Sequence, residues 1–231
     1  MNVLITGCSF TQGNNDSPSG NEMWIPWSNL VHFDGYDVRN VAKSSYGQGK
    51  IVQSVVQFLE ESDQRPDLVI IQLSAILRGY STNVNDFYFR ITNQRESFFL
   101  LHDDDYITPD AGWVHKVSIA EDELDSETHW NAYTKVLLLK TYLQQKNQDY
   151  IMFWGWNQLE NCPTNIKLLW KKNIYDENFW SYGTWGGMSE YITDKIGKKG
   201  IIPMDFHPST EGHQLFYNDI IKPKLKDYFG Y

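Results

Sequence analysis

Hydrophobic residues along the chain gather in short runs that are apolar at nearly every position. Residues 2–5 (NVLI) and 68–73 (LVIIQL) form two such runs, and each run is followed by small or polar residues. A strand that is apolar on both faces is typical of a buried parallel sheet. Residues 36–41 and 149–154 are expected to form two further strands, so the sequence predicts at least four.

Other stretches carry apolar residues at a helical spacing. Apolar side chains recur every three or four positions in residues 50–61 and again in residues 129–145. A closing helix is predicted after Ser209 or Thr210, either of which can cap it, and it should run to about Tyr228. Helices therefore alternate with the predicted strands.

This alternation predicts one α/β domain over residues 1–231, built as a three-layer α/β/α sandwich with a central parallel sheet. Ligands bind at the carboxyl ends of the strands in such sheets. Residues 79–128 show no clear period, and an insertion or lid is expected there because long unstructured connections are uncommon unless they are functional. Residues 156–185 are expected to be irregular and aromatic.

Composition narrows the class of protein. Hydrophobic residues make up 41% of the 231 residues, which is enough for a sizeable core. The net charge of -9 argues against sequence-independent binding to nucleic acid, which needs a basic surface, and against docking on anionic lipid. No apolar run approaches the roughly 20 residues that cross a bilayer, and the first residues do not resemble a secretory signal. A cytoplasmic protein, or one carried by a particle assembled there, is expected.

Two motifs at opposite ends of the chain have the residue types for nucleophilic catalysis. Ser9 follows the first predicted strand, and Gly7 permits a sharp turn there. A serine nucleophile needs an imidazole to accept its proton, and His207 lies just before the closing helix with Pro208 beside it. Either motif alone is more common as a turn or a helix cap, so it is their combination that suggests chemistry.

Backbone and aromatic groups are candidates for the rest of this site. Residues 40–49 (NVAKSSYGQG) follow the second predicted strand, and their glycines expose N–H groups that can face a developing negative charge. The chain also has 9 Trp, 14 Tyr and 12 Phe. Trp156 follows a strand at the expected active face, where it can form a substrate wall or pack in the core. Aromatic faces of this kind stack well on sugar rings.

Taken together and in this order, these motifs resemble those of the SGNH/GDSL hydrolase superfamily. Residues 7–10 (GCSF) resemble its first block, residues 40–49 its second, residues 68–74 fall where its third belongs, and residues 205–208 resemble its fifth. The histidine motif and the following Gly-His pair are the most specific part. The resemblance implies a flavodoxin-like SGNH fold, with Ser9 as the nucleophile, His207 as the general base and Gly47 as an oxyanion donor. It implies no metal or organic cofactor.

The sequence departs from the family pattern at three places. Cys8 stands where the first block usually has Asp. The third block lacks its usual Asn, so Ser74 is the preferred replacement donor, Gln72 a weaker one, and Arg78 a further contact for an anion. The family's catalytic Asp lies three residues before the histidine, where this chain has Met204. Asp205, two residues before His207, is the candidate acid; without it the site is a Ser-His dyad.

The resemblance implies a serine esterase that acts on a small-molecule or glycan ester, with an O-acetyl group on a carbohydrate as the expected substrate. Chains of this kind look similar to bacteriophage-encoded hydrolases. One alternative is a weak or inactive protein of the same fold that binds glycans or is associated with a virion. Another is a flavodoxin-like nucleotide binder, but residues 7–13 lack the lysine of a phosphate-binding loop. The oligomeric state is left open.

Overall fold

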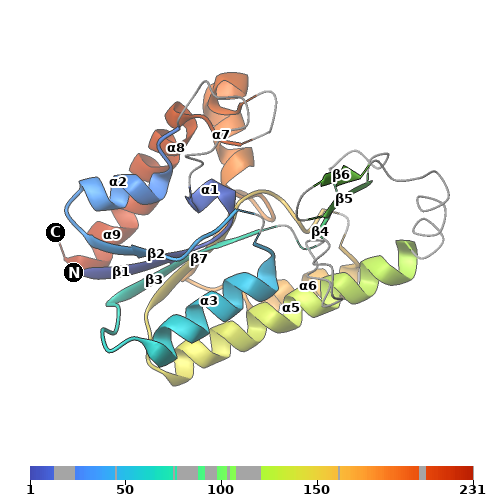
Figure 1. Cartoon of the computed structure of the whole chain (residues 1–231), viewed down its shortest axis with the longest axis horizontal. Helices are drawn as coiled ribbons and strands as arrows, with labels where there is room; N and C mark the ends of the chain where they lie inside the picture. The colour runs from blue at the N-terminus through green and yellow to red at the C-terminus, as the bar shows by residue number, and fades with distance from the viewer. Residues whose placement is uncertain are drawn as a thin grey trace.

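The computed structural model describes residues 1–12, 24–44, 46–74, 76, 88–91, 98–102, 105–107, 121–160, 162–202 and 207–230. Its centre is a five-stranded sheet in the order β2-β1-β3-β7-β8, in which every neighbouring pair is parallel (Figure 1). The strands are β1 (Asn2–Thr6), β2 (Asp37–Asn40), β3 (Leu68–Leu73), β7 (Tyr150–Trp154) and β8 (Phe179–Trp180). The predicted fold class is therefore confirmed.

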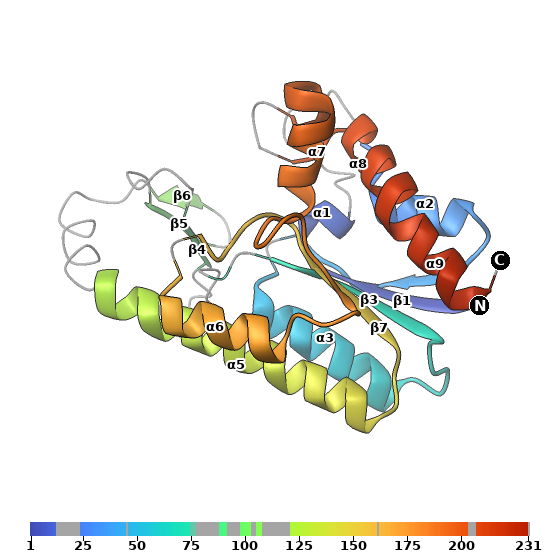
Figure 2. The ribbon, with the colours of Figure 1, turned by 180° about the vertical axis from the view of Figure 1, so that it is seen from behind.

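Helices cover both faces of this sheet, as Figures 1 and 2 show from opposite sides. One layer holds α3 (Gln48–Glu61), α5 (Glu121–Gln145) and α6 (Thr164–Asn173). The other holds α2 (Trp27–Phe33), α7 (Met188–Ile196), α8 (Thr210–Phe216) and α9 (Lys222–Phe229), with a π-helical turn (Tyr217–Ile221) joining α8 to α9. The short helix α1 (Ser9–Gln12) lies at the carboxyl end of β1, and a 3-10 turn (Gly197–Gly200) follows α7.

Alternation along the central strands builds two separate cores. Leu4 and Ile71 pack into the cluster under α3, α5 and α6, whereas Ile5 and Ile70 pack into the cluster under the opposite helix layer. All four side chains have no exposed surface. Burying a side chain of this size stabilises a fold by roughly 1.5–3 kcal/mol. This two-sided burial explains why the apolar runs in the sequence are continuous rather than alternating.

The structure differs from the sequence prediction in the middle of the chain. Helix α5 begins at Glu121, eight residues before the predicted start. The segment expected to be irregular contains α6, which starts after Pro163, and the edge strand β8. Within residues 79–128, an antiparallel sheet forms from β4 (Tyr88–Ile91), β5 (Phe98–His102) and β6 (Asp105–Ile107). The single-domain organisation and the role of the insertion stay predictions.

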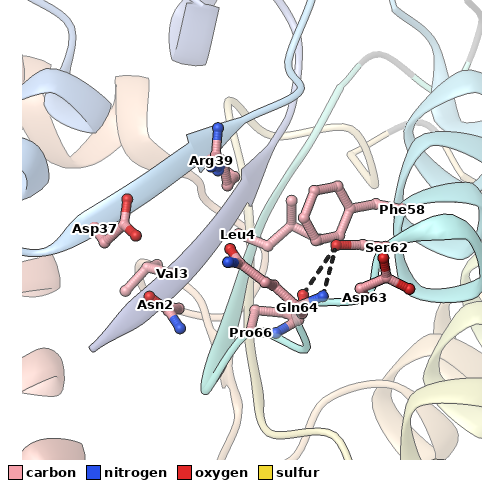
Figure 3. A pocket seen from close by; sticks show the side chains of 10 residues that line it. All are labelled: Asn2, Val3, Leu4, Asp37, Arg39, Phe58, Ser62, Asp63, Gln64 and Pro66. Carbon is pink, nitrogen blue, oxygen red and sulfur yellow. Dashed lines mark hydrogen bonds between the residues drawn. The ribbon is translucent and has the colours of Figure 1, made fainter.

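A cavity of about 380 Å³ lies at the amino ends of β1 and β3, the end of the sheet away from Ser9 (Figure 3). Asn2 begins β1 and Pro66 precedes β3, and both contribute to its wall. Hydrogen bonds between Ser62 and Gln64 close the loop on one side of it. Among the helices that the structure describes, none is both long and apolar enough to cross a membrane.

Candidate active site

Ser9 lies at the start of α1, where the chain turns sharply out of β1. The turn closes through hydrogen bonds from the backbone N–H groups of Thr11 and Gln12 to the carbonyl of Cys8. A Cβ at Gly7 would lie 2.4 Å from the Thr11 hydroxyl oxygen, so only glycine fits this approach. The turn thus places Ser9 at the carboxyl edge of the sheet, where 5% of its surface is exposed.

Helix α1 is also held from the side. The carbonyl of Thr11 accepts hydrogen bonds from the Ser28 hydroxyl on α2 and from the Asn40 side-chain amide at the end of β2. These contacts connect the first and second sequence motifs directly. The side-chain NH2 group of Asn40 therefore helps to hold the serine turn in place, while its side-chain oxygen accepts a hydrogen bond from the Ala42 backbone N–H.

His207 lies on a loop that runs antiparallel to the end of the 3-10 turn after α7. The Ile202 N–H donates to the His207 carbonyl at 2.7 Å, and the Ser209 N–H donates to the Gly200 carbonyl at 2.8 Å. The imidazole packs between two aromatic rings, with centroid distances of 4.9 Å to Phe10 and 5.2 Å to Trp24. Backbone and ring contacts together restrict the orientation of the imidazole.

The structure brings the two predicted chemical groups into contact. The Nε2 atom of His207 lies 2.6 Å from the Oγ of Ser9, although 198 positions separate the residues in the chain. A nucleophile and its base need a separation of about 2.6–3.2 Å. When the imidazole is neutral and protonated on Nδ1, Nε2 accepts the hydrogen bond that the serine hydroxyl donates. This arrangement can activate Ser9 as a nucleophile.

Two predicted site residues, Asp205 and Arg78, fall outside the described part of the chain. Their proposed roles as the orienting acid and as an anion contact therefore stay predictions. Gly47 is described, and it forms the N-cap of α3, with its carbonyl accepting from Lys50 and Ile51. This places it at the same carboxyl edge of the sheet as Ser9, and its role as an oxyanion donor also remains a prediction.

Ser74, the other candidate donor, is fully buried at the end of β3. Its backbone forms a double hydrogen bond with the Gln48 side chain: the Ser74 N–H donates to Oε1 at 3.2 Å, and its carbonyl accepts from Nε2 at 2.5 Å. Gln48 follows Gly47 directly, so this pair fixes the second motif against the third. Hydroxyl donation by Ser74 to an oxyanion stays a prediction.

The hydrogen bonds of Gln72, the weaker candidate donor, go to its own strand and to the serine turn. Its side chain has no exposed surface, and its Nε2 donates to the neighbouring Leu73 carbonyl at 2.6 Å. The amide oxygen points instead to the serine turn, where it accepts from the Cys8 N–H and the Thr11 hydroxyl. Strand alternation turns this side chain toward the neighbouring turns, and donation by Gln72 to an oxyanion, like that by Ser74, stays a prediction.

Aromatic rings line the side of the site next to His207. The ring of Trp156 lies 5.0 Å from that of Phe10, which in turn contacts the imidazole. The sequence left open whether Trp156 forms a substrate wall or packs in the core, and it gave no indication of Phe10 or Trp24. The sequence feature that could have pointed to these two residues is the high aromatic content of the chain, but that content does not show which rings lie near the site.

His213 follows the glycine of the C-terminal motif and is completely buried in α8. Burial lowers the pKa of its imidazole to about 3, and the charge of His207 acts in the same direction. His213 therefore stays neutral at ordinary pH. No cluster of three or more His, Cys, Asp or Glu side chains that would hold a metal ion occurs among the described residues.

Comparison with solved structures shows which fold this is. No family model matches the sequence, and no curated protein is significantly similar to it. The esterase EstA from Pseudoalteromonas sp. superposes with a TM-score of 0.53 at 13% identity, covering 100% of this chain and 99% of that one. TesA superposes with a TM-score of 0.52 at 13% identity, and the match covers 99% of both chains. Axe2, an acetylxylan esterase from Geobacillus stearothermophilus, superposes with a TM-score of 0.50 at 12% identity. The match covers 100% of this chain and 94% of Axe2.

The chain shares its overall fold with these three proteins. This confirms the fold that the sequence resemblance implied.

Within this fold, the C-terminal motif has a clear structural basis. The Ser209 hydroxyl caps α8 by accepting from the Gly212 N–H at 3.1 Å, and it donates to the Lys199 carbonyl. A Cβ on Gly212 would lie 2.3 Å from the Gly200 carbonyl oxygen. The serine and the glycine therefore fix α8 against the 3-10 turn, and this contact sets the position of the His207 loop.

Proposed function

We propose that this protein is a serine esterase that removes O-acyl groups through a covalent acyl-enzyme. The observation that carries the proposal is the 2.6 Å contact between His207 Nε2 and Ser9 Oγ. The position of Ser9 on a tight turn at the carboxyl end of β1 supports it, because that edge is where ligands bind in open parallel sheets.

In the first half-reaction, Ser9 Oγ attacks the ester carbonyl carbon as its proton passes to His207 Nε2. The carbonyl oxygen becomes an oxyanion, for which the N–H groups of Ser9 and Gly47 and the Ser74 hydroxyl are the proposed donors. Each such donor is typically worth about 3 kcal/mol of barrier. The C–O bond to the alcohol then breaks, and His207 returns the proton to the leaving oxygen.

In the second half-reaction, water attacks the acyl group on Ser9 and gives a proton to His207 Nε2. Collapse of the new tetrahedral intermediate releases the carboxylic acid and returns the proton to Ser9 Oγ. Asp205 is the proposed group that holds the imidazole in the correct tautomer. The packing of Phe10 and Trp24 on the ring limits its rotation in the same way.

An acetyl group on a carbohydrate is the substrate we propose. Phe10 packs on the His207 imidazole, and the partly exposed ring of Trp156 packs on Phe10. A partly exposed aromatic ring of this kind suits the apolar face of a sugar. The acetylxylan esterase Axe2 has the same fold. Initial rates on acetylated xylo-oligosaccharides, compared with p-nitrophenyl butyrate and octanoate, test this class. Faster turnover of the octanoate ester than of the acetylated sugars would contradict it.

A fluorophosphonate probe tests the reaction itself, because it phosphonylates only an activated serine. EstA, which has this fold, has been crystallised as a form inhibited by monoethylphosphonate. We expect covalent labelling of the wild type at Ser9, located by peptide mass spectrometry, and none in Ser9→Ala or His207→Ala. Folded wild-type protein that takes up no label would overturn the esterase proposal and support a glycan-binding protein of the same fold.

A further inference from the structure

We propose that Gln72 is a positioning residue for the nucleophile: its side chain fixes the turn that carries Ser9 without touching the substrate. The kinetic part of this inference rests on the proposed esterase function. The structural part, that Gln72 anchors the serine turn, stands independently of it.

The first support is the set of hydrogen bonds around one amide. Gln72 Oε1 accepts from the Cys8 N–H at 3.2 Å, from the Cys8 thiol at 3.3 Å and from the Thr11 hydroxyl at 3.0 Å. Cys8 and Thr11 have no exposed surface. A buried N–H that loses its acceptor incurs the full desolvation cost of the group, so this oxygen strongly favours one conformation of the turn.

The second support is steric. A Cβ on Gly7 would lie 2.8 Å from Gln72 Oε1, and a Cβ on Gly155 would lie 2.5 Å from Gln72 Nε2. Gly7 follows β1, and Gly155 follows β7. Because β3 lies between β1 and β7 in the sheet, the Gln72 side chain fills the space between both turns. The two glycines leave room for an amide at this position.

The consequence concerns the residue next to Cys8. Ser9 Oγ must stay within hydrogen-bond distance of His207 Nε2. Ser9 directly follows Cys8, whose backbone N–H donates to Gln72 Oε1, so Gln72 restrains the backbone next to the nucleophile. Displacing a reacting group by about 1 Å can reduce a rate about 100-fold. Removing the amide should therefore lower the rate of attack by Ser9 while leaving substrate binding nearly unchanged.

Gln72→Met is the test variant, because methionine has a similar length and no hydrogen-bonding amide. Gln148→Met is the matched control. Gln148 is also a buried glutamine, but it bonds to Arg65 and to the carbonyls of Pro66, Asp67 and Asp149, at the amino ends of the strands. Both substitutions should lower the melting temperature. Only Gln72→Met should lower kcat and the rate of fluorophosphonate labelling, by about 10- to 100-fold, with KM within about twofold.

Gln72→Glu is the conservative variant and the safeguard if Gln72→Met does not fold. A buried glutamic acid in its neutral form keeps a carbonyl acceptor and one donor, one donor fewer than the amide, and burial favours that form. We expect kcat within a few-fold of the wild type below pH 7 and a decline as the acid ionises at higher pH. A wild-type pH profile in this variant would contradict the role assigned to the amide.

A thiol measurement keeps the inference separate from the esterase proposal. Cys8 is buried, and its thiol contacts Gln72. If Gln72→Met loosens the turn, Cys8 should be alkylated about tenfold faster in that folded variant than in the wild type. Gln148→Met should leave the alkylation rate unchanged. Mass spectrometry of the native proteins measures both rates. If Cys8 stays protected in folded Gln72→Met, or if Gln148→Met loses kcat equally, the inference is wrong. If Cys8 is exposed but the wild type takes no label, only the esterase proposal fails.

Discussion

Phe10 packs against His207 with a ring-centroid distance of 4.9 Å, and it directly follows Ser9. The residue next to the proposed nucleophile therefore supports the proposed base. This contact ties the turn after β1 to the loop before α8, so any change that moves one of them is expected to disturb the pair.

Ser9 and His207 are expected to act as a unit. Ser9→Ala, His207→Ala and the double variant should each lower kcat for p-nitrophenyl acetate by about 10⁴-fold or more, with no further loss in the double variant. Initial-rate kinetics measure this, and Ser62→Ala is the control because Ser62 lines the cavity at the other end of the sheet. Multiplicative losses in the double variant would show that the two residues act separately.

Gly212 should be intolerant of even a methyl group. In Gly212→Ala the new Cβ meets the Gly200 carbonyl oxygen and Ile192, so α8 must shift, and overpacking of this kind costs about 1–3 kcal/mol. Because the same turn holds the His207 loop, kcat should fall as well. Chemical denaturation and initial rates measure the two effects.

Gly49→Ala is the matched glycine control for that prediction. Gly49 lies in α3, and the nearest atoms that its Cβ would meet in the described part of the chain belong to the Lys135 side chain, at 3.6 Å or more, which is an ordinary contact. Alanine is the better helix former, so stability should rise by up to about 1 kcal/mol. Equal destabilisation by the two alanines would mean that the Gly200–Gly212 contact is not important.

Lys140 connects α5 to the end of α6 below the sheet. Its ammonium lies 2.5 Å from an Asp176 oxygen and donates to the carbonyls of Asn173 and Ile174. Lys140→Met leaves that carboxylate and those carbonyls partly unpaired, which should lower the free energy of unfolding by about 2–4 kcal/mol. Urea denaturation measures the loss.

The control for Lys140 is an exposed ion pair. Lys199 lies 2.9 Å from Glu211 with more than half of both side chains exposed, so Lys199→Met should cost no more than about 1 kcal/mol. A comparable loss in both variants would contradict the importance of burial at Lys140.

His213 should make the fold sensitive to mild acid. Its pKa is about 3 in the folded protein and about 6.5 when unfolded, so the unfolded chain binds the proton more readily. The contribution of the neutral imidazole to the free energy of unfolding is fully present above pH 6.5. It is lost as the pH falls toward 3, by up to about 1.4 kcal/mol per pH unit.

Urea denaturation of the wild type and of His213→Leu between pH 7.5 and pH 5 tests this prediction. Most carboxyl groups remain ionised in this window, so the difference between the two proteins isolates the imidazole. The wild type should lose more stability on acidification than the variant. Parallel losses in both proteins would show that another group is responsible.

Much of the fold follows from local pattern. Residues 68–73 were predicted as a strand with the bounds that the structure has, because a run with no polar interruption can be stable only where both faces are covered. Helix α6 was missed. Its buried side chains are Ile166 and Trp170, while Leu168 on the same helix is exposed, so its apolar period was hidden. The edge strand β8 has only two residues, too short for a period.

The sequence by itself determined the fold class and the two chemical groups, since apolar spacing and motif order are local properties of the chain. Only the tertiary structure decided that Ser9 and His207 are in contact, and that the Gln72 amide oxygen faces the serine turn. The orientation of Gln72 depends on β1 and β7 lying on either side of β3 and on the space left by Gly7 and Gly155. Those neighbours come from distant parts of the chain, and their spacing is set by how the sheet packs.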